Sequence, residues 1–271
     1  MPTMRVNGAT IAYEESGSGQ ETIVFAHGLL WDGYMFHKQI AALRDRYRCV
    51  TLDFRGQGKS EVTRDGYDMD TLTLDAAQLI ERLGYAPVHF AGLSMGGFVA
   101  MRLAARRPEL IRSLILMETS AEPEPTQNIP KYRMFYRVAR IFGPGAVASR
   151  VMPIMFGQKF MSDPARAAER EEWRRRASAN HRVGIGRATE GVISRKGITE
   201  EISKITAPTL IVVGDQDVAT VPARAQRIHE LIPGSRLVVI PGAGHTSSIE
   251  EPEAVTAAIE SFLAGLPGSQ P

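Results

Sequence analysis

The chain has 271 residues, of which 44% are hydrophobic and 23% charged, and its formal net charge is +2. This is an ordinary globular composition, and the charge is too small to indicate nucleic acid or an acidic partner. The single cysteine, Cys49, excludes an intramolecular disulfide. No apolar stretch approaches the roughly 20 residues that cross a bilayer, and no signal-peptide pattern opens the chain. We therefore expect a cytoplasmic protein with no membrane partner.

The predicted elements begin with short strands and then alternate. Strands at 4–6 and 10–15 flank the turn pair Asn7-Gly8, which predicts a hairpin. Apolar, β-branched runs then predict strands, and runs of 3.6-residue periodicity predict helices. In chain order these are a strand at 22–26, a helix at 36–44, strands at 49–53 and 88–92 around a helix at 69–83, a helix at 96–105 and a strand at 113–117. Such alternation predicts an α/β fold, with a mostly parallel central sheet and helices on both faces.

The strand signal stops after Ser120 and returns only at 209–213. The segment between reads as helices and turns, opening with Ala-Glu-Pro-Glu-Pro. A helix at 222–231, a strand at 236–240 and a helix at 252–263 complete the pattern, and the last residues, 267–271, are expected to fray. We therefore expect a core domain of residues 1–120 and 207–271, into which residues 121–206 are inserted as a helical cap.

The strongest motif is Gly92-Leu-Ser-Met-Gly96, which matches G-x-S-x-G between a predicted strand and a predicted helix. A sharp strand-to-helix turn forces its central residue into a strained conformation and needs small neighbours. The serine hydroxyl then stands at a helix N-terminus, where developing negative charge is favoured. Ser94 is therefore the candidate nucleophile.

A serine needs a base, and the base needs an orienting carboxylate. His245 follows the last strand in a glycine-rich loop, Gly242-Ala-Gly-His-Thr246, and is the candidate base. Asp217 follows the strand at 209–213 and is the preferred acid. Asp215 in the same turn is expected to brace it, and Glu118, at the end of the strand at 113–117, is a third option.

Two backbone N–H groups are candidates for stabilising an oxyanion: that of Met95, after the nucleophile, and that of Leu29, in the loop after the strand at 22–26. His27, in the same loop, is expected to brace it by hydrogen bonds. The segment Asp53-Phe-Arg-Gly-Gln-Gly-Lys-Ser60 lacks phosphate-loop spacing, and we interpret it as a tight connection braced by Asp53 and Arg55.

Together these motifs resemble the α/β-hydrolase fold family, in the branch with a helical cap. The resemblance rests on His27-Gly-Leu-Leu, the segments beginning at Asp53 and Gly92, Gly214-Asp-Gln-Asp and Gly244-His-Thr, and runs from about Ile11 to Leu263. It implies a Ser94, His245 and Asp217 triad. Similar sequences include carboxylesterases, enol-lactonases, acyl-homoserine lactonases, carbon–carbon bond hydrolases and cofactor-free perhydrolases. Haloalkane dehalogenases and epoxide hydrolases of this fold use an aspartate where this chain has Ser94.

The pocket is expected between the carboxyl ends of the strands and the cap. Its candidate lining residues are large and apolar: Trp31, Phe36, Met134, Phe135, Met155 and Phe156. We expect a serine hydrolase of the carboxylesterase or lactonase type that cleaves a small carboxylic ester or lactone through an acyl-serine intermediate. No cofactor or metal is expected. Perhydrolysis or carbon–carbon cleavage on the same triad, a non-catalytic ligand receptor and homo-oligomer formation stay open as alternatives.

Overall fold

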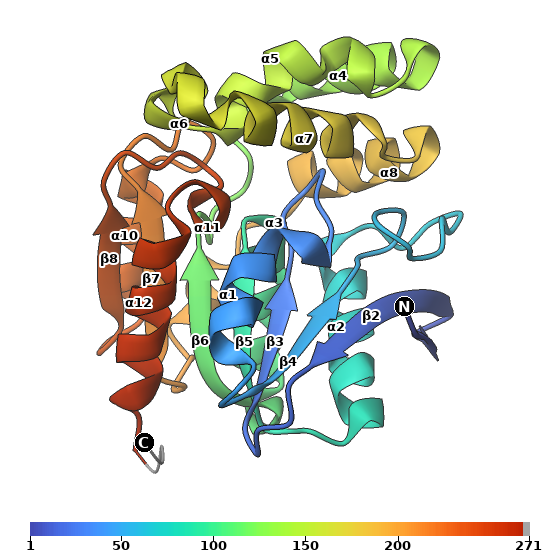
Figure 1. The fold of residues 1–271 in the computed structure, drawn as a ribbon. Coiled ribbons are helices and arrows are strands. Elements are labelled where there is room, and N and C mark those ends of the chain that lie inside the picture. The colour runs from blue at the N-terminus through green and yellow to red at the C-terminus, as the bar shows by residue number, and fades with distance from the viewer. Residues whose placement is uncertain (268–271) are drawn as a thin grey trace.

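The computed structural model describes residues 1–267, which form one eight-stranded sheet in the order β1-β2-β4-β3-β5-β6-β7-β8 (Figure 1). The β1–β2 and β2–β4 pairs are antiparallel, and all other neighbours are parallel. The strands are β1 (Thr3–Val6), β2 (Ala9–Ser16), β3 (Thr22–Ala26), β4 (Arg48–Leu52), β5 (Val88–Leu93), β6 (Ile111–Met117), β7 (Thr209–Gly214) and β8 (Arg236–Ile240). The predicted α/β class with a mostly parallel sheet is confirmed.

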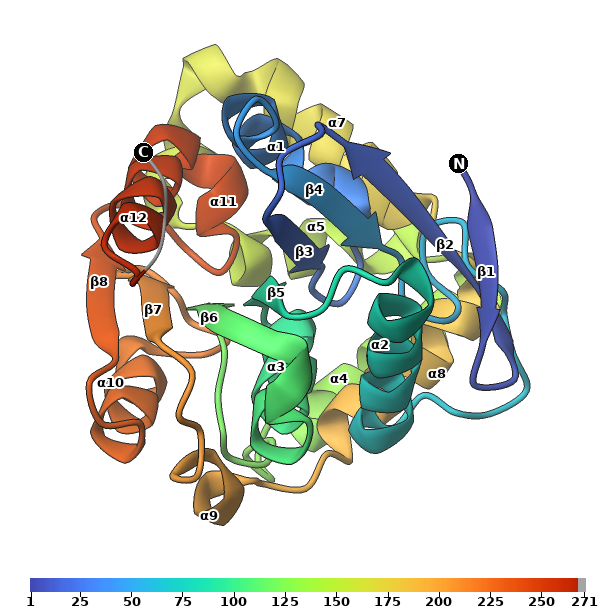
Figure 2. The same cartoon turned by 90° about the horizontal axis from the view of Figure 1, so that it is seen from below.

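Helices cover both faces of the sheet, as Figures 1 and 2 show from two directions. One face carries α1 (His37–Leu43), α11 (Ser247–Glu250) and α12 (Pro252–Ala264). The other carries α2 (Met69–Leu83), α3 (Met95–Arg106) and α10 (Pro222–Leu231). Each layer has its own apolar core, because strands buried on both faces present alternate side chains to opposite sides. Short 3₁₀ turns at η1 (Gly33–Phe36) and η2 (Pro108–Leu110) lead into α1 and β6.

The connection between β6 and β7 consists of helices and turns and contains no strand. It contains α4 (Ile129–Phe142), α5 (Gly145–Met155), α6 (Gln158–Ser162), the 3₁₀ turn η3 (Pro164–Arg166), α7 (Ala167–Ser178), α8 (Arg182–Ile193) and α9 (Thr199–Ile202). Figure 1 shows α4, α5, α7 and α8 lying across the carboxyl ends of the parallel strands. The short α9 instead returns to the core, where it contacts α3 and α10 and buries Ile202. The helices α4 to α8 are therefore the part of this connection that covers the sheet, and we call them the cap.

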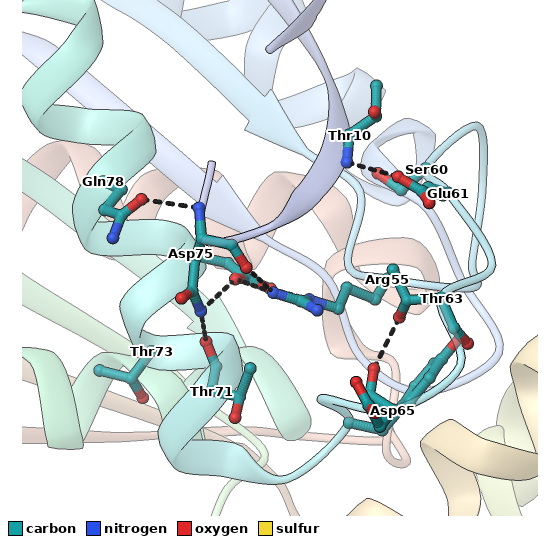
Figure 3. Close-up of polar contacts among 12 residues, drawn as sticks. Thr10, Arg55, Ser60, Glu61, Thr63, Asp65, Thr71, Thr73, Asp75 and Gln78 are labelled. Carbon is teal, nitrogen blue, oxygen red and sulfur yellow. Dashed lines mark hydrogen bonds and ion pairs between the residues drawn. The ribbon is translucent and has the colours of Figure 1, made fainter. Parts of the chain in front are cut away.

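The connection after β4 is held by two carboxylates. Oδ2 of Asp53 accepts a hydrogen bond from the Lys59 N–H at 2.8 Å. Arg55 donates through Nε and Nη2 to the Asp75 carboxylate on α2, at 2.6 and 2.7 Å, and through Nη2 to the Asn7 carbonyl at 2.7 Å. Figure 3 shows the Arg55 and Asp75 side chains facing one another between this connection and α2. The buried Arg55–Asp75 pair, with the bond from Arg55 to Asn7, therefore ties the connection to both α2 and the first hairpin.

Within the described residues, no helix is long and apolar enough to cross a bilayer. No group of three or more His, Cys, Asp or Glu side chains in that part of the chain could hold a metal ion. Fraying is expected for residues 267–271. Of these, residues 268–271 lie outside the part of the chain that the structure describes.

Candidate active site

Ser94 occupies the turn between β5 and α3 with φ 52° and ψ −109°. Such a conformation costs a non-glycine residue about 1–3 kcal/mol and persists only where its surroundings hold it. The Ser94 N–H donates to the Met117 carbonyl on β6 at 2.8 Å, and the Thr119 hydroxyl donates to the Ser94 carbonyl at 2.9 Å. A Cβ at Gly96 would overlap the carbonyl oxygen of Ala26, so the helix can approach β3 only because this residue is glycine. The G-x-S-x-G pattern therefore forms the strained turn that it predicts.

His245 lies in the loop after β8, beside Ser94 and Asp217. Its Nε2 is 2.9 Å from the Ser94 Oγ, and its Nδ1 is 2.9 Å from the Asp217 Oδ2. All three side chains are buried. They come from the carboxyl ends of β5, β8 and β7, which meet at one edge of the sheet. The structure thus brings together the three residues that the sequence singles out.

Asp217 is fixed by donors on both of its oxygens. Oδ1 accepts the backbone N–H groups of Ala219 and Thr220 at 2.8 and 2.9 Å, and Oδ2 accepts the Thr220 hydroxyl at 2.8 Å. Burial raises the pKa of Asp217, but the His245 charge and these hydrogen bonds outweigh burial and lower the pKa below its ordinary value. An ionised Asp217 places the His245 proton on Nδ1 and leaves Nε2 to accept the Ser94 hydroxyl proton.

The other two acids are placed differently. Asp215 accepts the Gly242 N–H at 2.7 Å and braces the turn, as predicted. Glu118 follows β6 with a φ of 43° and is fully buried. Burial, reinforced by the nearby charges of Asp217 and Glu250, raises the pKa of Glu118 well above its ordinary value. A neutral carboxylic acid is a poor partner for an imidazolium, so Glu118 fits the orienting role less well than Asp217.

Glu250 of α11 holds the loop that carries His245, and sequence reasoning missed it. Its carboxylate accepts the N–H groups of Gly244, at 3.0 Å, and of Thr246, at 3.2 Å. It also accepts the Gly157 N–H, from the loop before α6, at 2.8 Å. Burial raises the pKa of Glu250 despite these donors. One carboxylate therefore joins the His245 loop to the cap.

The two backbone groups expected to meet an oxyanion lie near Ser94. Met95 is the first residue of α3, so its N–H has no acceptor within the helix. Leu29 lines the same pocket as Ser94. Its loop is held by His27, whose Nδ1 donates to the Gly28 carbonyl at 2.7 Å while its Nε2 accepts the Phe54 N–H at 3.0 Å. His27 is thus a brace, as its sequence context indicates.

A pocket opens at Ser94 and His245, beneath the cap, and we call it the Ser94 pocket. Trp31 and Met155 line it, as predicted. Phe135 lines an adjoining, almost wholly apolar chamber between α4, α5, α7 and α8, which we call the cap chamber. The two spaces share five wall residues, namely Leu29, Leu30, Tyr132, Met155 and Thr189.

The other three predicted wall residues line neither space. Phe36 is fully buried against Phe25, with ring centroids 5.1 Å apart. Phe156 stacks on Phe160 at 4.6 Å. Met134 is 47% exposed, because successive residues of a helix point about 100° apart and its neighbour Phe135 takes the inward position on α4. These placements correct the prediction for Phe36, Met134 and Phe156.

The Ser94 pocket also contains a buried ion pair that sequence analysis did not predict. The Arg195 Nη1 is 2.9 Å from the Glu124 Oε2, and both side chains are more than 90% buried. The guanidinium lies over the Phe98 ring, 4.2 Å from its centroid. Burial lowers the pKa of Arg195, opposed by Glu124, and burial raises the pKa of the nearby Tyr132 to about 12. In the sequence, Glu124 lies in a loop before α4 and Arg195 follows the end of α8. Charged residues at such positions are usually solvated, so the sequence does not indicate that they are buried.

Comparison with known proteins agrees with this architecture. The model of the alpha/beta hydrolase fold family matches residues 21–252. A thermophilic esterase from Thermogutta terrifontis, solved with malate bound, is 29% identical with a TM-score of 0.90, covering 97% of this chain and 98% of that one. The enol-lactonase from Burkholderia xenovorans LB400 is 30% identical with a TM-score of 0.89, covering 97% and 100%. A bromoperoxidase from Bacillus anthracis is 26% identical with a TM-score of 0.84, covering 94% and 96%.

The fold and the arrangement at the strand ends are those of an α/β hydrolase. The chain belongs to the α/β-hydrolase fold family, and its relatives indicate a hydrolase that acts on a small molecule.

Proposed function

We propose that this protein hydrolyses small carboxylic esters or lactones through an acyl-Ser94 intermediate, in a site that the cap helices α4 to α8, within the inserted residues 121–206, cover. The observation that carries the proposal is the unbroken hydrogen-bond chain from the Ser94 Oγ through His245 to Asp217, with both links at 2.9 Å. The similarity to an esterase and an enol-lactonase supports the same reaction class.

In the first half of the reaction, the Ser94 Oγ bonds to the substrate carbonyl carbon as its proton passes to the His245 Nε2. The carbonyl oxygen becomes an oxyanion, which the N–H groups of Leu29 and Met95 receive; losing one such donor typically costs about 3–4 kcal/mol. The C–O bond to the alcohol then breaks, and His245 returns its proton to the departing oxygen. In a lactone this alcohol remains part of the acyl group.

In the second half, a water molecule gives its proton to the His245 Nε2 and its oxygen bonds to the acyl carbon. The bond to the Ser94 Oγ then breaks, the proton returns to that oxygen, and the acid leaves. The almost wholly apolar cap chamber suits the hydrocarbon part of an acyl group or an alcohol, because burying apolar area is favourable.

The first test measures p-nitrophenyl esters of increasing acyl length with the wild type and Ser94→Ala. We expect the variant to lose about 10⁴-fold or more in kcat/KM, because the nucleophile is removed. A fluorophosphonate probe should label the wild type at Ser94. Ser162→Ala is the matched control and should keep both properties, because this exposed serine donates to the Gln158 carbonyl within α6 and has no other hydrogen bond among residues 1–267. Ester turnover that survives Ser94→Ala, or probe binding without a covalent adduct, would overturn the proposal.

Perhydrolysis is the second candidate, because the chain is similar to a bromoperoxidase. In that reaction hydrogen peroxide replaces water in the second half, and a peroxy acid leaves. Monochlorodimedone bromination with acetate, peroxide and bromide would detect it. A rate that depends on both acetate and Ser94 favours perhydrolysis, and no bromination above the Ser94→Ala background excludes it.

A further inference from the structure

The buried pair Arg195–Glu124 forms a polar end in an otherwise largely apolar pocket. The guanidinium has five N–H groups. Within residues 1–267, its hydrogen bonds all leave from Nη1, toward the Glu124 carboxylate and the Val192 carbonyl, both at 2.9 Å. The Nε is buried and has no acceptor in that part of the chain. The Nε–Nη2 edge of the guanidinium therefore has no hydrogen-bond partner among the described residues, and Arg195 lines the same pocket as Ser94 and His245.

An unpaired donor edge at this depth is unusual. Buried polar groups are nearly always hydrogen-bonded, and leaving a donor unsatisfied costs free energy that the fold gains nothing from. The Arg195 side chain is only 3% exposed, so bulk water does not solvate it as it would a surface arginine. An acceptor brought by a ligand would satisfy the Nη2 group, which, unlike Nε, is not fully buried.

The charge of the pocket decides what kind of acceptor fits. Glu124 already neutralises Arg195, and its two oxygens accept from Asn128 and from Arg195. A substrate carboxylate would approach the same pair, lose its hydration and meet the Glu124 charge, so the attraction of Arg195 would be largely cancelled. A carbonyl oxygen needs only the N–H donors and buries no net charge.

We propose that the Nη2 group of Arg195 binds an uncharged carbonyl group of the substrate, so that the preferred esters or lactones carry a ketone or amide oxygen apart from the bond that is cleaved. This inference rests on the proposed hydrolysis at Ser94. In this proposal Arg195 selects the substrate, and Glu124 neutralises the charge of Arg195 so that the pair favours an uncharged acceptor.

The test compares esters that differ by one carbonyl in place of a methylene. On the acyl side these are the p-nitrophenyl esters of 4-oxopentanoic, 5-oxohexanoic and 6-oxoheptanoic acids against pentanoate, hexanoate and heptanoate. On the alcohol side, 2-oxopropyl hexanoate is compared with propyl hexanoate. We expect at least one oxo ester to exceed its hydrocarbon partner in kcat/KM by roughly 10-fold or more, the effect of a hydrogen bond to a charged group.

The variants remove the pair without stranding a buried charge. Arg195→Met combined with Glu124→Gln should abolish the oxo preference while hydrocarbon esters are still hydrolysed. The matched control is Arg133→Met with Glu190→Gln, which removes an exposed ion pair of the same types on α4 and α8 and should change neither rate. An oxo preference that survives loss of Arg195, or that is absent from every wild-type pair, overturns the inference.

Glu124→Gln alone should shift the substrate preference in a different direction, toward an ester that carries a carboxylate. It leaves Arg195 with a net positive charge, so the mono-p-nitrophenyl ester of adipic acid, which bears a carboxylate, should gain relative to the hexanoate ester. A wild type that already prefers the carboxylate ester to the oxo ester would show that Arg195 binds anions, contrary to the proposal.

Binding to Ser94→Ala separates this inference from the proposed function. Titration calorimetry should give tighter binding of methyl 5-oxohexanoate, or of the oxo ester preferred in the kinetic series, than of its hydrocarbon partner. That difference should vanish when Arg195 and Glu124 are also changed. A retained binding difference with no turnover by the wild type would refute hydrolysis alone. Turnover of hydrocarbon esters with no binding difference would refute the carbonyl site alone.

Discussion

Asp217→Asn tests the orienting role most sharply, because the contacts of Asp217 dictate how the new amide must lie. The Oδ1 position receives two backbone N–H groups, from Ala219 and Thr220. An amide NH₂ there would face two donors, so the asparagine oxygen takes this position and its NH₂ takes the place of Oδ2. That NH₂ then faces the His245 Nδ1.

The consequence is the wrong tautomer. Nδ1 of His245 must accept from the amide, so the ring proton moves to Nε2, which then donates toward the Ser94 Oγ instead of accepting from it. In triads of this geometry the same exchange lowers kcat by about 10⁴-fold, or about 5.4 kcal/mol of transition-state stabilisation. The Thr220 hydroxyl, which also lies 3.3 Å from Nδ1, cannot replace a negative charge.

The assay is single-turnover acylation with a p-nitrophenyl ester, which isolates the step that needs the base. Asp215→Asn is the control, since Asp215 braces the turn through the Gly242 N–H and has no contact with His245 among the described residues. Glu118→Gln extends the comparison, because burial raises the pKa of Glu118 and the neutral amide resembles the neutral acid. Acylation by Asp217→Asn within tenfold of wild type, or a loss in Glu118→Gln as large as in Asp217→Asn, would refute the assignment.

Three further predictions concern the fold around the site. Arg55→Met leaves the buried Asp75 carboxylate unpaired, so the free energy of unfolding, measured with guanidinium chloride, should fall by about 3–5 kcal/mol. Adding Asp75→Asn should recover part of that loss. A loss below about 1 kcal/mol would show that the ion pair contributes little to stability. Burial raises the pKa of the Cys49 thiol to about 12, so Ellman's reagent at about pH 8 should react only as the protein unfolds, and rapid reaction of the native protein would contradict that burial. Because the pKa of Asp217 is lower in the folded protein than in the unfolded chain, where it is about 3.9, its ionisation stabilises the fold above that pH, and this stabilisation is lost as the pH falls through the folded pKa. The difference in free energy of unfolding between wild type and Asp217→Asn should therefore narrow below about pH 4. A difference that widens there would show that the pKa is not lowered.

The sequence predicts best where function depends on local backbone geometry. The strained turn at Ser94 needs glycine at fixed offsets, and His245 stands in a glycine-rich loop after the last strand, so short motifs single out both residues. The strand and helix pattern is predictable for the same reason, since each element's burial sets its own periodicity.

The pocket walls could not be predicted in the same way. They depend on how the cap helices rotate about their axes, and Met134 and Phe135 are equally apolar in sequence although only Phe135 faces inward. Arg195 and Glu124 look like solvated charges until the two ends of the helical connection meet above Phe98. The role of Glu250 could not be predicted either, because most of its partners are backbone N–H groups, which leave no mark in the sequence.

Glu250 also couples the position of the cap to the order of the His245 loop. The same carboxylate that positions the backbone on either side of His245 accepts the Gly157 N–H from the cap side of the pocket. A movement of the cap that carries Gly157 away withdraws one donor from a buried charge, and the remaining donors must then hold that charge alone. We therefore expect the His245 imidazole to be held most firmly when the cap lies over the pocket, which is also when solvent is best excluded.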